Sequence, residues 1–76
     1  MTTPMFPVKS SQISYIGYDE DNNELYVTFS NDTTYKYSDV PKEVYNELSK
    51  AKSVGKYFAQ NIKNKYSTIK VNIHDA

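Results

Sequence analysis

The sequence predicts an α+β fold in which a three-stranded antiparallel meander is followed by two short helices packed on one face of the sheet. Apolar and polar residues alternate in segments 25–29 and 33–37, which is typical of strands with one buried face. After residue 41, apolar residues recur at three- and four-residue spacing, which is typical of helices. A chain of 76 residues has the length of one domain.

The first predicted strand, residues 13–18, contains an irregularity. Ile13 and Ile16 are three residues apart, whereas strict alternation places the residues of one face two apart. A β-bulge near Tyr15 or Gly17 brings both isoleucines to the buried face. We therefore predict a bulged strand here.

The second and third predicted strands form a hairpin whose register follows from side-chain parity, because directly opposite residues share a face. A two-residue turn places Lys36 opposite Val27, on the buried face. A three-residue loop at residues 30–32 sets Val27 opposite Tyr35 and gives one consistent apolar face. We predict this second register, which requires Asp32 to adopt the left-handed backbone conformation.

Pro41 marks the start of the first predicted helix, because proline fits the first turn and disfavours helical backbone at the residue before it. The apolar face of this helix consists of Val44, Tyr45, Leu48 and Ala51. The helix ends before Ser53, which is a favourable N-cap for a second helix. The apolar stripe of the second helix consists of Val54, Tyr57, Phe58, Ile62 and Tyr66.

The two ends of the chain have weaker patterns. Residues 1–7 contain two prolines and no periodicity, so we expect an extended arm. Residues 67–76 alternate apolar and polar side chains and form either an added edge strand or a loose tail. The sequence has no apolar stretch of transmembrane length and no signal-peptide pattern, so we expect a cytoplasmic protein with no membrane contact.

Residues that carry out catalysis or bind metals are scarce. The acidic segment 19–24 lacks the Gly and Glu positions of a calcium-binding EF-hand, and we predict a polar hairpin loop there. The chain has no Cys, and its single histidine, His74, lies near the end, where we expect it to be solvated. Ser10 and Ser11 have no base beside them, and a backbone hydrogen bond at the start of the strand explains them. We predict no catalytic residues, no metal, no cofactor and no enzymatic activity.

Four spaced motifs between Val8 and Tyr66 resemble the KTSC domain. They are V-x-S-S-x-I-x-x-I-G-Y-D, L-x-V-x-F, Y-x-Y-x-x-V-P-x-x-V-Y-x-x-L and A-x-S-x-G-x-Y-F-x-x-x-I-K-x-x-Y. This small domain is known as a free-standing bacterial and phage protein and as the C-terminal part of some lysyl-tRNA synthetases. The resemblance implies one domain over residues 8–66 and no particular activity. Similar domains usually have Gly where this chain has Asp32.

Charge is distributed unevenly along the chain. Residues 1–47 contain eight acidic residues and three lysines, whereas residues 48–76 contain six lysines and one acidic residue. A basic half can mark a nucleic-acid-binding face, and the alternative is that the two halves fold together and their charges intermix. Every basic residue is Lys, which favours phosphate contacts over base-specific recognition, where Arg predominates.

The start of the second helix is the first candidate binding surface. A helix N-terminus attracts anions through its free N–H groups, here those of residues 54–56, and its positive dipole end. The candidate anion- or nucleic-acid-binding residues are Lys52, Ser53, Gly55, Lys56, Lys63 and Lys65. We expect RNA or tRNA as the partner, since similar domains accompany a tRNA-charging enzyme. The alternative is that these residues only shape the corner between the two helices, where Ser53 caps the second helix and Gly55 allows close packing.

The sheet face opposite the helices is the second candidate surface. Its residues are Tyr26, Thr28, Thr34 and Lys36. Tyrosine is enriched at protein interfaces. The alternative function is therefore a protein-interaction module, phage- or prophage-encoded, that binds or inhibits a host protein. An ordinary solvated cross-strand pair explains the same residues.

Overall fold

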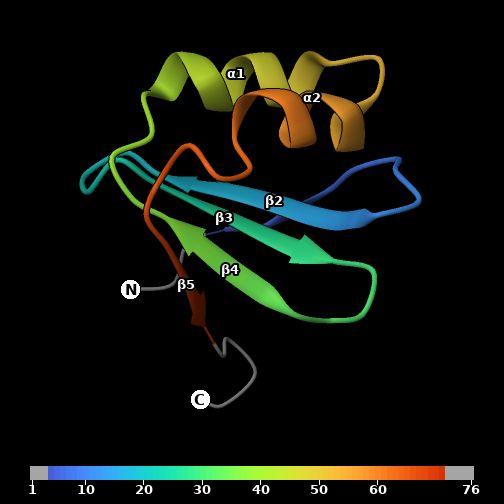
Figure 1. Ribbon diagram of the computed structural model, residues 1–76, viewed down its shortest axis with the longest axis horizontal. Helices are drawn as coiled ribbons and strands as arrows, with labels where there is room; N and C mark the ends of the chain where they lie inside the picture. The colour runs from blue at the N-terminus through green and yellow to red at the C-terminus, as the bar shows by residue number, and fades with distance from the viewer. Residues whose placement is uncertain (1–3, 72–76) are drawn as a thin grey trace.

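The computed structural model describes residues 4–71, in which two helices cover one face of an antiparallel sheet (Figure 1). The five strands lie in the order β1-β2-β3-β4-β5. They are β1 (Phe6–Pro7), β2 (Ile13–Asp19), β3 (Glu24–Phe29), β4 (Thr34–Tyr37) and β5 (Thr68–Val71). The α+β class and the placement of the helices are confirmed, whereas the prediction of three strands is wrong. His74 and the rest of residues 72–76 lie outside the described residues, as do residues 1–3.

The two strands that the sequence pattern missed form the edges of the sheet. β1 pairs with β2, so part of the predicted arm is a strand, and Pro7 lies opposite Tyr15. Proline is compatible with this position because an edge strand leaves some N–H positions unpaired. β5 pairs with β4 and places Val71 opposite Thr34. Of the two alternatives for the C-terminal segment, the edge strand is therefore correct for residues 68–71.

The predicted bulge in β2 is confirmed. The register of β2 against β3 shifts between Ile13 and Tyr15. As a result, Ile13 and Ile16 both point into the core, with exposed fractions of 0% and 1%. The extra residue thus reconciles the three-residue spacing with a single buried face.

The predicted register of the β3–β4 hairpin is also confirmed. Val27 lies opposite Tyr35, and the Phe29 N–H donates to the Thr33 carbonyl oxygen at 2.8 Å, which closes a three-residue loop. Asp32 has a φ of 67°, in the left-handed region. Tyr35 and Phe29 lie on the helix side, as predicted, but they are half-buried rather than fully buried.

The starts of both helices follow the predicted signals, but the second helix ends before Ile62 and Tyr66, which were predicted to belong to its apolar stripe. α1 (Lys42–Lys50) starts directly after Pro41, and α2 (Val54–Asn61) starts after Ser53. The Ser53 Oγ accepts a hydrogen bond from the Lys56 N–H at 3.3 Å, which confirms the N-cap. Between the two helices, Ala51 has extended backbone, so α1 ends there.

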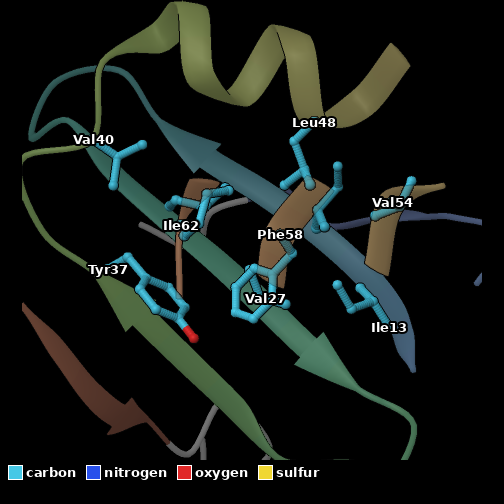
Figure 2. Packing of buried hydrophobic residues seen from close by; sticks show 10 residues of the cluster. Ile13, Val27, Tyr37, Val40, Leu48, Val54, Phe58 and Ile62 are labelled. Carbon is cyan, nitrogen blue, oxygen red and sulfur yellow. The ribbon is translucent and has the colours of Figure 1, made fainter. Parts of the chain in front are cut away.

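The core lies between the helices and the sheet, and its apolar side chains interdigitate there (Figure 2). Its buried members are Ile13, Ile16, Leu25, Val27, Tyr37, Val40, Leu48, Val54, Phe58 and Ile62. Phe58 of α2 makes edge-to-face contacts with Phe29 and Tyr37, with ring centroids 5.4 and 5.5 Å apart. These contacts fix the orientation of α2 on the sheet, because edge-to-face pairs restrict ring geometry.

Candidate functional site

The loop before β2 packs directly against the start of α2. The Ser10 Oγ accepts hydrogen bonds from the N–H groups of Gln12 and Ile13 at 3.2 and 3.3 Å. This bonding confirms the structural role predicted for this hydroxyl. A Cβ on Gly55 would lie 3.2 Å from the Ser10 Oγ and 3.1 Å from the Gln12 Oε1, which is closer than most Cβ contacts. The close packing at Gly55 therefore involves the protein's own loop.

This packing creates a basic hollow, a surface depression of about 310 Å³. Its lysines and serines are Lys9, Lys52 and Lys56, and Ser10, Ser11 and Ser53. The lysines come from two segments that are far apart in the sequence, and all three side chains are exposed. No acidic residue lines the hollow. In residues 4–71, the ion pairs join Lys36 to Glu24 and Lys42 to Glu20, so the lysines of the basic hollow have no carboxylate partner there.

The helix start within the basic hollow offers fewer free amides than expected. We expected free N–H groups at residues 54–56, but the Lys56 N–H is occupied by the Ser53 cap. The N–H groups of Val54 and Gly55 have no hydrogen-bond partner among the described residues. The dipole and two amides therefore add to the positive potential of the three lysines.

A second and larger depression of about 670 Å³ adjoins the basic hollow. We call it the aromatic hollow, because its apolar wall consists of Phe29, Tyr35, Tyr37 and Phe58. Gln12 and Ala59 line both depressions, which are therefore neighbours. The aromatic rings come from β3, β4 and α2, so the packing of the helix on the sheet shapes this wall.

Tyr37 is the most deeply placed polar group of the aromatic hollow. Its exposed fraction is 5%, and no described residue forms a hydrogen bond with its hydroxyl. Burial raises the pKa of Tyr37 to about 12, and the nearby Tyr35 contributes to the rise. The hydroxyl is therefore protonated at neutral pH and retains its capacity to donate a hydrogen bond.

The structure brings together most, but not all, of the predicted basic site. The residues from Lys52 to Lys56 meet in the basic hollow, and Lys63 lines the aromatic hollow. Lys65 lines neither depression. Sequence reasoning missed Lys9 as a member of the site, because its proximity to α2 is a long-range contact with no local pattern.

The second candidate surface differs from the expectation. Thr28 and Thr34 have exposed fractions of 4% and 2%, so the prediction that they line an open surface is wrong. Their hydroxyl oxygens lie 2.7 Å apart in a mutual hydrogen bond, and the added strand β5 flanks Thr34. Lys36 lies opposite Tyr26 as predicted, but its Nζ is 3.1 Å from the Glu24 Oε2, and this bond raises the pKa of Lys36.

The acidic segment after β2 forms a hairpin loop, as predicted. The Asp19 carboxylate accepts hydrogen bonds from the Asp21 N–H at 3.1 Å and from the Asn22 Nδ2 at 2.8 Å. Across residues 4–71, no cluster of three or more metal-ligating side chains has the geometry of a metal site. In the same part of the chain, neither helix has the length and apolar character needed to span a membrane.

Comparison with known proteins identifies relatives of the chain. The KTSC domain model matches residues 9–66. A protein of Tsukamurella paurometabola is 35% identical over 65 residues, which cover 86% of this chain and 97% of the relative. A protein of Stutzerimonas stutzeri is 39% identical over 56 residues, covering 74% of this chain and 79% of the relative.

The structural comparison agrees with the family match. The crystal structure of a KTSC domain protein from Yersinia pestis superposes with a TM-score of 0.90 at 37% sequence identity. The superposition covers 93% of this chain and 100% of the Yersinia chain. The family model and the solved structure therefore agree that this chain belongs to the KTSC domain family.

Proposed function

We propose that the protein is a non-catalytic binding domain that contacts single-stranded nucleic acid, RNA or tRNA, through the basic hollow. The observation that carries the proposal is the convergence of Lys9, Lys52 and Lys56, none paired with a carboxylate in residues 4–71, on one depression without acidic residues. A phosphate group fits this arrangement, because lysines supply charge while serine hydroxyls and helix-start amides donate hydrogen bonds.

The surface that continues from the basic hollow matches a chain of phosphates better than a single anion. Lys63 follows α2, which ends at Asn61, and lines the adjoining aromatic hollow. Lys65 extends the basic segment further. Because the cations are all lysines, we expect binding that depends weakly on base sequence. The association of similar domains with lysyl-tRNA synthetases supports this only as an analogy at the level of fold.

Titration of labelled single-stranded RNA and of tRNA at rising salt concentration tests the proposal. Contacts by four lysines (Lys9, Lys52, Lys56 and Lys63) predict a slope of log K against log salt near −3, at about −0.7 for each contact. In the double variant Lys52→Gln and Lys56→Gln, two contacts are lost, and the slope falls to about half.

The matched control is the double variant Lys50→Gln and Lys70→Gln. It has the same charge change, and both side chains are exposed and line neither hollow. We expect the control to keep the wild-type slope. The proposal is contradicted if RNA does not bind at low salt, or if both double variants lose the same amount of affinity and slope.

A protein partner is the second candidate function, and one observation favours it. The sheet face without helices exposes apolar side chains, with exposed fractions of 45% for Tyr15 and 54% for Ile69. Ile69 lies beside Lys36, which lies opposite Tyr26, so these side chains share that face. An interface centred on such residues depends little on salt, unlike phosphate binding. Binding that persists at high salt and is lost on Tyr26→Ala favours this function.

A further inference from the structure

The aromatic hollow has the size and lining of a small-ligand site. Its volume of about 670 Å³ falls within the usual range of such sites. Phe29 and Tyr35 contribute half-buried rings to its wall. Phe29 makes edge-to-face contacts with Tyr35 and Phe58 at centroid distances of 5.7 and 5.4 Å, so the rings are held in place before any ligand binds. A rigid aromatic wall is suited to stacking against a flat ring.

A hydrogen-bond donor lies in this wall. The Tyr37 hydroxyl is on a residue with an exposed fraction of 5% and has no partner among the described residues. No fully buried side-chain N or O atom in residues 4–71 lacks a hydrogen-bond partner, so this hydroxyl keeps contact with solvent and is available to a ligand as a donor. A ligand with ring nitrogens or carbonyl oxygens at its edge accepts a hydrogen bond from this hydroxyl, whereas an aliphatic chain has no acceptor to offer. Figure 2 shows the ring of Tyr37 in the same cluster as Phe58, and the two ring centroids are 5.5 Å apart.

The position of the aromatic hollow relative to the basic hollow restricts the ligand further. Gln12 and Ala59 line both depressions, so a ligand in one of them lies next to the other. Asn31 and Asn64 also line the aromatic hollow, and side-chain amides are groups that can pair with the polar edge of a heterocycle. The neighbouring cations select a ligand that carries negative charge next to its flat ring.

We propose that the aromatic hollow binds one nucleobase of the bound strand, with the attached phosphate in the basic hollow. This inference rests on the proposed function of the basic hollow and adds a base subsite to it. It predicts that the protein distinguishes a nucleotide from a sugar phosphate of the same charge. Base stacking on aromatic side chains is sequence-tolerant, which agrees with the lysine-only basic surface.

Titration of the whole chain with AMP and with ribose 5-phosphate, followed by two-dimensional ¹H–¹⁵N NMR, tests the inference. We expect AMP to bind at least about fivefold more tightly than ribose 5-phosphate, because only AMP has a base to stack. AMP should shift the amide signals of Phe29 and Tyr35, whereas ribose 5-phosphate should shift mainly those around Lys56. Tyr37→Phe removes only the hydroxyl oxygen, and we expect it to weaken AMP binding roughly threefold to tenfold without affecting ribose 5-phosphate.

The matched control is Tyr15→Phe, which removes an exposed hydroxyl on the opposite sheet face and should leave both affinities unchanged. Equal affinities for the two probes, with no effect of Tyr37→Phe, overturn the base subsite and leave the basic hollow standing. AMP-induced shifts centred on Tyr26 and Lys36 overturn it as well. If neither probe nor RNA binds, the proposed function fails first, and the base subsite fails with it.

Discussion

Replacing Asp32 with glycine should stabilise the domain. Asp32 has a φ of 67° at the third position of the β3–β4 loop, and no described residue forms a hydrogen bond with its side chain. A left-handed conformation costs an L-residue about 1–2 kcal/mol, and less for Asp, whose short polar side chain tolerates it. Glycine removes this cost but loses about 0.5–1 kcal/mol more conformational entropy on folding. The net gain for Asp32→Gly is therefore up to about 1 kcal/mol.

Alanine at the same position separates backbone strain from the loss of the side chain. Asp32→Ala also removes the carboxylate, yet it keeps the Cβ that disfavours the left-handed region. We expect Asp32→Ala to be less stable than Asp32→Gly by about 1 kcal/mol. For a domain of this size, that difference corresponds to roughly 4–8 °C in Tm. Urea denaturation followed by circular dichroism gives the free energies of unfolding.

The neighbouring residue provides the control. Asn31 is outside the left-handed region, and its Oδ1 accepts a hydrogen bond from the Thr33 N–H at 3.0 Å. Asn31→Gly therefore loses this bond and gains no relief of strain, and we expect a loss of about 1 kcal/mol. The reasoning is refuted if Asp32→Gly is no more stable than Asp32→Ala, or if Asn31→Gly is as stabilising as Asp32→Gly.

Three further predictions concern the arm, the helix cap and pH. Gly17→Ala should lower the free energy of unfolding by about 1–3 kcal/mol, because its Cβ would lie 2.5 Å from the Pro4 carbonyl oxygen and displace the arm; an unchanged urea midpoint contradicts this. Ser53→Ala should cost about 1 kcal/mol through loss of the bond to the Lys56 N–H, and wild-type stability in the same denaturation counts against the cap. The pKa of Tyr37 is raised from 10.0 to about 12, because the folded state favours its neutral form. The resulting contribution to the free energy of unfolding is complete below pH 10 and is lost as the pH rises from 10 to 12. The free energy of unfolding, measured from pH 8 to 12, should decline less steeply for Tyr37→Phe than for the wild type. Identical declines would show that the Tyr37 hydroxyl does not cause this pH dependence.

The register of the sheet was predictable because the alternative registers would have buried a charged side chain or exposed a large apolar one. A two-residue turn would have placed Lys36 on the apolar face, and an unbulged β2 would have exposed either Ile13 or Ile16. Such constraints arise only where a strand has one buried face. β5 is almost entirely exposed, so no burial pattern distinguished it from a loose tail, and β1 is too short to show any period.

The candidate site was predictable only in its local part. Residues 52–56 combine a cap, a glycine and two lysines within one turn, and this pattern is visible in the sequence. Lys9 joins them because the loop of residues 9–12 packs on α2, which is a tertiary contact. The burial of Thr34 was missed for a related reason, since a prediction of three strands leaves out β5, which pairs with the strand that carries Thr34.

Gly55 provides a means of separating the two interpretations of the α2 start, as a packing corner or as a binding surface. In Gly55→Ala, the new Cβ would press on the Ser10 Oγ, which two backbone N–H groups hold in place, and on the exposed Gln12 side chain. Alanine also gains up to about 1 kcal/mol in helix propensity, which offsets part of the strain. We therefore expect a free energy of unfolding within about 1 kcal/mol of the wild type.

The effect of Gly55→Ala on RNA binding should be larger than its effect on stability. Movement of the loop away from α2 carries Lys9 out of the basic hollow, so one phosphate contact is lost and the salt slope becomes shallower by about 0.7. The amide signals of residues 9–12 report the displacement directly in an NMR spectrum of the variant. If these signals move while RNA affinity and slope stay unchanged, Gly55 serves packing alone and Lys9 has no part in binding. If affinity falls in a folded variant, the contact between the loop and the helix is what assembles the binding surface.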